Sequence, residues 1–113
     1  MNVRFAEQSL RCRVSTAEVQ TLLTGRAITL EVVLPHDHAF RLTVRPSALN
    51  QWQLASDPTG LWLSIPRAEI EGLAQTLPSK EGIAHTCETA NGKHLEVMFE
   101  VDVKKEKRMA DSR

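Results

Sequence analysis

The residues best suited to chemistry are His36-Asp37-His38, where two of the four histidines flank an aspartate. Residues two apart in a β-strand point to the same side, so the two imidazoles could bind one metal ion. A catalytic zinc site needs a third protein ligand, and no other His, Cys or carboxylate has the spacing of one. The triplet also follows Pro35 and separates two segments of alternating apolar residues. We therefore predict a hairpin tip, and we expect neither a metal nor a cofactor.

A second pair of reactive side chains is His85 and Cys87, two residues apart in a predicted strand. On that spacing both point inward, with backbones about 7 Å apart. A nucleophilic cysteine needs nearby positive charge and access to water, and no third residue that would orient such a pair is evident. Cys12 and Cys87 are therefore predicted to be buried and unreactive.

Four arginines alternate with apolar residues and so face solvent: Arg11, Arg13, Arg41 and Arg45. This stripe could contact an anion or a partner protein. The final strand turns three carboxylates outward in the same way: Glu96, Glu100 and Asp102. We predict that the first and last strands are neighbours, so that Arg11 and Arg13 face these carboxylates. No aromatic residue is expected between the arginines, and 14 basic residues balance 14 acidic ones, so no nucleic-acid partner is expected.

Alternation and capping residues predict the elements that hold these side chains. Asn2–Val14 alternates, but its apolar phase shifts near residues 6–9, which requires a bulge or a short turn. Ser15 and Glu18 form a capping-box pattern that starts a helix ending at Gly25. The remaining predicted elements are strands at 28–34, 40–44, 52–54 and 61–65, a helix that starts at Pro66 and ends before Pro78, and strands at 83–90 and 93–103 joined by a two-residue Asn91-Gly92 turn.

The predicted order is β-α-β-β-β-β-α-β-β, which is typical of the α+β class. We expect one domain over residues 1–103: a mostly antiparallel, curved sheet of about six or seven strands, with two short helices on one face or at one end. Residues 104–113 are predicted to be a flexible charged tail. No internal repeat, signal peptide or membrane span is evident, so we expect a cytoplasmic protein.

The opening segment N-V-R-F-A-E-Q-S-L-R-C-R-V-S-T-A-E-V resembles that of a family of small uncharacterised bacterial proteins. The matching residues are Ser9, Leu10, Arg11, Arg13, Ser15, Glu18 and Val19, while Gln8 stands where the family has Asn. Leu42–Val44 and Phe99–Val103 resemble its central and closing strands. The resemblance implies a shared compact fold and a bacterial cytoplasm, and it brings no assigned activity.

Two functions remain open. The favoured one is a non-enzymatic binding or protein-interaction domain, which would contact a partner protein or a second copy through a sheet edge or its outward Arg/Glu face. It is favoured because the predicted core and turns leave no convergent polar residues. The alternative is a small ligand-binding protein or enzyme with a site near His85 and Cys87, because these two polar side chains share an inward phase.

Overall fold

The computed structural model describes residues 1–77 and 81–102. It contains, in order, β1 (Asn2–Ala6), β2 (Ser9–Val14), α1 (Thr16–Leu23), β3 (Ile28–Leu34), the short 3-10 helix η1 (Pro35–Asp37), β4 (His38–Ser47), β5 (Gln53–Asp57), β6 (Gly60–Pro66), α2 (Arg67–Gln75), β7 (Ile83–Glu88) and β8 (His94–Val101). The predicted α+β class is confirmed. The predicted tail at 104–113 lies outside the described residues.

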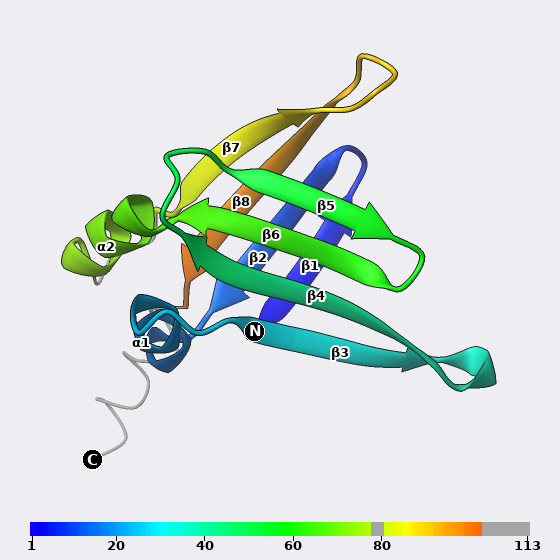
Figure 1. Ribbon diagram of the computed structural model, residues 1–113, viewed down its shortest axis with the longest axis horizontal. Helices are drawn as coiled ribbons and strands as arrows, with labels where there is room; N and C mark the ends of the chain where they lie inside the picture. The colour runs from blue at the N-terminus through cyan, green and yellow to red at the C-terminus, as the bar shows by residue number, and fades with distance from the viewer. Residues whose placement is uncertain (78–80, 103–113) are drawn as a thin grey trace.

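The strands form two sheets of four instead of one curved sheet (Figure 1). The strand orders are β1-β2-β8-β7 and β3-β4-β6-β5. The outer pairs of each sheet are antiparallel, as expected, but the central pairs β2–β8 and β4–β6 are parallel. The two helices lie together at one end of the sandwich, in agreement with one of the two predicted placements.

One apolar core lies between the sheets and under the helices. Its members come from both sheets, from both helices and from the segment before β5: Leu10, Cys12, Val14, Val19, Leu22, Ile28, Leu42, Val44, Trp52, Leu63, Ile65, Ile70, Leu73, Val97, Phe99 and Val101. Inward residues alternate with outward ones along each strand, as the sequence pattern indicates. Each fully buried aliphatic or Phe side chain contributes roughly 1.5–3 kcal/mol relative to an exposed one.

The chain consists of two similar units, each with the order β-β-α-β-β. The first hairpins correspond with a shift of 51 residues, which takes Ala6 to Asp57 and Ser9 to Gly60. After the helices the shift is 55, which takes Ile28 to Ile83. The shift of 51 aligns S-L-R-C-R-V-S-T-A-E-V-Q-T-L-L with G-L-W-L-S-I-P-R-A-E-I-E-G-L-A. The expectation of no internal repeat was therefore wrong. The repeat is difficult to recognise in the sequence because the units share few identities and differ in loop length.

The two units exchange their hairpins. The first hairpin of one unit pairs with the second hairpin of the other, through β2–β8 in one sheet and β6–β4 in the other. Each sheet is therefore built from both units. This exchange places the first and last parts of the chain side by side, as predicted.

The predicted start of the first helix is confirmed in detail. The Ser15 hydroxyl accepts a hydrogen bond from the Glu18 amide at 3.1 Å, and the Glu18 carboxylate accepts one from the Ser15 amide at 2.9 Å. Gly25 follows the helix with φ of 91°, a conformation that glycine adopts without strain. The second helix starts one residue later than predicted, because Pro66 is its N-cap and offers no side-chain hydrogen bond.

Two predicted turns differ from those observed. The segment predicted as the first strand, Asn2–Val14, is a hairpin. Its turn at Glu7-Gln8 has φ of 55° at Gln8, and this turn accounts for the shift of the apolar phase. Beyond the ends of β7 and β8 the Thr89 amide donates to the Lys93 carbonyl at 2.7 Å, so the turn of the last hairpin has three residues, Ala90, Asn91 and Gly92. Asn91-Gly92 is therefore not a two-residue turn, although the hairpin itself is confirmed.

Candidate ligand-binding site

The His36-Asp37-His38 segment joins β3 to β4, so its prediction as a hairpin tip is confirmed. His36 and Asp37 have φ values of 71° and 61°, and all three side chains are exposed. Asp and His tolerate this left-handed conformation better than most residues. Within residues 1–77 and 81–102, no group of three or more His, Cys, Asp or Glu side chains could hold a metal ion.

The two cysteines differ in burial. Cys12 is fully buried, as predicted, and burial raises the pKa of its thiol to about 11. Cys87 is only half-buried, so its predicted burial was wrong in degree. It lies on β7, an edge strand, where fewer neighbours cover it. Burial also raises the pKa of the Cys87 thiol, which keeps it protonated at neutral pH.

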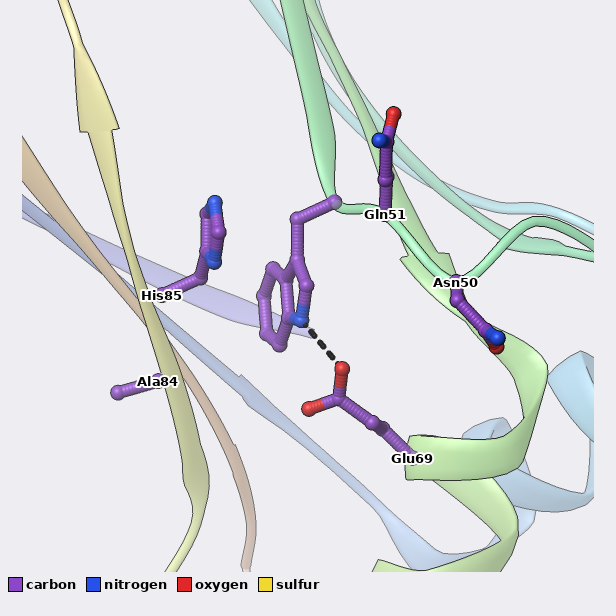
Figure 2. Close-up of a pocket in the computed structure, with 6 residues that line it drawn as sticks. Asn50, Gln51, Glu69, Ala84 and His85 are labelled. Atoms are coloured by element: carbon purple, nitrogen blue, oxygen red, sulfur yellow. Dashed lines mark hydrogen bonds between the residues drawn. The ribbon is translucent and has the colours of Figure 1, made fainter.

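Trp52 links both sheets to α2. It precedes β5 in one sheet, and its indole stacks on His85 of β7 in the other sheet, with ring centroids 5.4 Å apart and an interplanar angle of 8°. The indole Nε1 donates a hydrogen bond to Oε2 of Glu69 on α2 at 2.8 Å, the dashed line in Figure 2. These contacts leave Trp52 only 8% exposed.

An open cleft of about 420 Å³ surrounds this group. Its lining residues are Asn50, Gln51, Trp52, Glu69, Ala84 and His85. Figure 2 shows Glu69 extending from α2 and His85 from β7, while Ala84 and the Gln51 amide point away. The indole of Trp52 therefore lies between the His85 imidazole, which stacks on it, and the Glu69 carboxylate, which accepts from its Nε1. The ring nitrogens of His85 form no hydrogen bond with any described residue.

The equivalent carboxylate of the first unit also lines a cleft, of about 360 Å³, but both of its oxygens have partners. Glu18 corresponds to Glu69, Met1 to Trp52 and Leu30 to His85. Oε2 of Glu18 accepts from the Met1 ammonium at 3.0 Å, and Oε1 accepts from the Ser15 amide. Desolvation raises the pKa of Glu18, but the bonds from Ser15 and the ammonium outweigh it, so the net pKa is lowered. Both oxygens of this carboxylate are therefore used by the fold.

Pro66 changes this arrangement in the second unit, because it stands where the first unit has Ser15. Proline has no amide hydrogen and no hydroxyl group, so it cannot complete a capping box with Glu69. One Glu69 oxygen binds Trp52, and the other has no hydrogen-bond donor among the described residues. Because Pro66 stands in place of serine, one carboxylate oxygen of Glu69 faces the cleft without a donor from the helix start.

The structure separates the four arginines proposed as anion or partner contacts. Arg11 and Arg13 lie on β2 beside β8, with Glu100 at 3.8 and 3.5 Å, so the predicted pairing of the first and last strands is confirmed. Arg41 and Arg45 lie in the other sheet. Arg41 is 2.6 Å from Glu31, and the Arg45 Nε donates to the Ser64 hydroxyl at 3.0 Å.

The expectation that no aromatic residue lies among the arginines was wrong for the second sheet. Trp62 on β6 is opposite Thr43 on β4, so it lies between Arg41 and Arg45 on the outer face. The alternation of inward Leu61, Leu63 and Ile65 would have shown this. Two carboxylates, Glu31 and Asp57, balance the two arginines on this face, so it has no excess positive charge to attract a polyanion.

His85 was predicted from the sequence as a candidate ligand contact, but its partners, Trp52 and Glu69, were not. Trp52 lies 33 positions and Glu69 16 positions before His85, and no motif joins them. The one available signal was Pro66 in place of a capping serine. That signal becomes visible only when the two units are aligned.

Among the described helices, none is long and apolar enough to cross a membrane.

Comparison with known proteins places the chain in a family. No curated protein and no solved structure matches the chain. One family model matches residues 1–112, nearly the whole length. The chain therefore belongs to DUF7009, a family of unknown function.

Proposed function

We propose that this chain is a non-enzymatic binding domain whose cleft at Trp52, Glu69 and His85 holds a small ligand with an ammonium or similar donor group. The observation that carries the proposal is the released oxygen of Glu69. The first unit uses both oxygens of the equivalent carboxylate for its own fold, whereas the second leaves one facing a cleft. A carboxylate oxygen without a partner attracts a cation or an N–H donor.

The cleft is organised before a ligand arrives. The indole of Trp52 holds one oxygen of Glu69, which fixes the direction of the other. The stacked indole also fixes the His85 ring, so little side-chain freedom is lost on binding. A hydrogen bond between charged groups contributes about 1.5–3 kcal/mol, which suits a small ligand of modest affinity.

The side chains of the cleft favour binding over covalent catalysis. The described lining residues supply a carboxylate, an imidazole and amides, and no Ser, Thr, Cys or Lys. Cys87 lies two residues beyond His85 on the same face of β7, but its raised pKa disfavours the reactive thiolate.

A second candidate function is contact with a partner protein or a second copy through a sheet edge. The edge strand β3 carries the exposed side chains Val32 (47%) and Val33 (63%), which support this candidate. An uncovered apolar edge strand is a common pairing surface.

A cytoplasmic location also stays a prediction, supported by the two free cysteines.

The test is a titration with n-butylammonium, monitored through the NMR signals of the Trp52 indole and the His85 ring. Butyrate, which has the same number of carbon atoms and the opposite charge, is the control ligand. We expect saturable shifts with the amine alone. Glu69→Gln should abolish them, because it removes the charge but keeps the shape, and His85→Leu should weaken them.

The matched control variant is Glu18→Gln, which makes the same change at the equivalent position of the first unit. It should bind n-butylammonium as the wild type does, even though it loses stability. Trp62→Phe assigns the two indole signals. Equal shifts with butyrate, or binding that survives Glu69→Gln, would refute the proposed site.

A further inference from the structure

Three arginines and an asparagine line a small hollow on the outer face of the β1-β2-β8-β7 sheet: Asn2, Arg4, Arg11 and Arg13. Arg4 on β1 is directly opposite Arg11 on β2, and Asn2 is opposite Arg13. All four side chains point to the same side of the sheet, because their neighbours Leu10, Cys12 and Val14 point into the core. The side chains of Arg11 and Arg13 are 41% and 42% exposed.

The local charge is not balanced. Glu100 is the carboxylate in contact with Arg11 and Arg13, at 3.8 and 3.5 Å, and Arg4 forms no ion pair with any described residue. Glu96 also faces outward, opposite Ser9, but it forms no ion pair with these arginines in the described part of the chain. Both contacts to Glu100 are too long for strong hydrogen bonds. Asp102 lines a neighbouring cleft together with Asn2 and Arg13, so the unbalanced charge is that of Arg4, which lies opposite Arg11. The buried Nε of Arg11 has no hydrogen-bond acceptor among the described residues.

The fold itself does not require these arginines. In the second unit the same four positions hold Gln53, Ala55, Trp62 and Ser64, and the hairpin forms with the same register. Like charges directly opposite each other destabilise a sheet, so Arg4 opposite Arg11 is a cost that the second unit avoids. By contrast, Leu10 and Glu18, which the fold uses, are repeated as Leu61 and Glu69. A costly feature that is absent from the repeat points to a role outside folding.

We propose that Arg4, Arg11 and Arg13, together with Asn2, bind an oxyanion of the phosphate type, either free or as the phosphoryl group of a small molecule. Guanidinium groups bind such anions through pairs of parallel N–H donors, and the Asn2 amide adds another donor. The anion replaces the missing negative charge between Arg4 and Arg11. This site is separate from the cleft at Trp52, because β1 and β7 are opposite edges of the sheet.

The test is calorimetric titration with inorganic phosphate and with phosphoserine, at constant ionic strength set by chloride. Arg4→Ala, which introduces the residue found at the equivalent position, should weaken binding about tenfold, since it removes charge-assisted hydrogen bonds. Glu100→Gln should strengthen binding, since it removes the carboxylate that competes for Arg11 and Arg13. A misfolded variant could not bind more tightly, so this second variant separates binding from folding.

Arg41→Ala is the matched control, because it removes the same charge from the other sheet. It should leave the affinity unchanged. Tighter binding of phosphoserine would assign the site to a phosphoryl group on a larger molecule, and tighter binding of inorganic phosphate would assign it to the free anion. The proposal is overturned if neither probe binds saturably, if Arg41→Ala weakens binding as much as Arg4→Ala, or if Glu100→Gln does not strengthen it.

Discussion

At the scale of single residues, Glu18 and Glu69 occupy equivalent positions but have different neighbours. The amide and hydroxyl of Ser15 contact Glu18, whereas Pro66 can donate nothing to Glu69. One substitution therefore decides whether both oxygens of the carboxylate are bonded within the fold or one has no donor among the described residues. The same reasoning explains why the pKa of Glu18 is lowered in spite of its desolvation.

In the Pro66→Ser variant, the new serine should donate to the Glu69 carboxylate as Ser15 donates to the Glu18 carboxylate. A completed cap adds about 1 kcal/mol of stability, and the loss of proline removes about 0.4–1 kcal/mol by loosening the unfolded chain. Chemical denaturation should therefore show little net change, while the affinity for n-butylammonium falls. Ser15→Ala, the control, should cost about 1 kcal/mol and leave that affinity intact. An unchanged affinity in Pro66→Ser would contradict the role given to Pro66.

Cys12 should make the protein less stable in alkaline solution. Burial raises its pKa from 9.0 to about 11, so the unfolded chain loses the thiol proton before the folded chain does. The stability that depends on the neutral thiol is complete below pH 9 and is lost as the pH rises toward 11. Urea unfolding across this range should show a steeper decline for the wild type than for Cys12→Ala. A decline of the same slope in both proteins would exclude this cause.

At the scale of elements, two glycines differ in whether their positions leave room for a side chain. A Cβ at Gly60, the first residue of β6, would overlap the backbone carbonyl of Arg41 on β4, whereas a Cβ at Gly72 in α2 would meet nothing within 4 Å. Gly60 thus allows β4 and β6 to pair as closely as they do. Gly72 has no such packing role.

Gly60→Ala should destabilise the protein by on the order of 2–4 kcal/mol, because backbone atoms cannot move away as a flexible side chain can. Gly72→Ala should stabilise it by about 0.5–1 kcal/mol, because alanine restricts the unfolded chain and favours the helix. Thermal and urea unfolding of the two variants measure these opposite effects. A stable Gly60→Ala variant would mean that β4 and β6 are not paired in the observed register.

At the scale of the whole molecule, the exchange of hairpins makes the two units depend on each other. The central strands β2 and β4 of the first unit have their parallel partners, β8 and β6, in the second. A unit on its own would expose these strands together with half of the core. Unpaired strands that would be central in a sheet are prone to association.

Residues 1–48 and 49–113, prepared separately, should therefore not fold as monomers. Mixed together, they should recover the β-sheet signal in circular dichroism and form a one-to-one complex in sedimentation. Either fragment alone should be unfolded or should pair with another copy of itself. A folded monomeric fragment would show that the unit, and not the exchanged pair, is the folding domain.

The sequence alone determined the features that depend on near neighbours. The Ser15–Glu18 cap, the tip at His36-Asp37 and the inward phase of His85 and Cys87 were all predictable, because each rests on interactions within a few residues. The tertiary structure alone decided which strands pair, and so whether eight strands form one sheet or two. It also brought Trp52, Glu69 and His85 together from three separate elements. Strand pairing is non-local, and alternation fixes the face of a residue but not its partner. The cleft and the arginine hollow therefore became visible only in the folded chain.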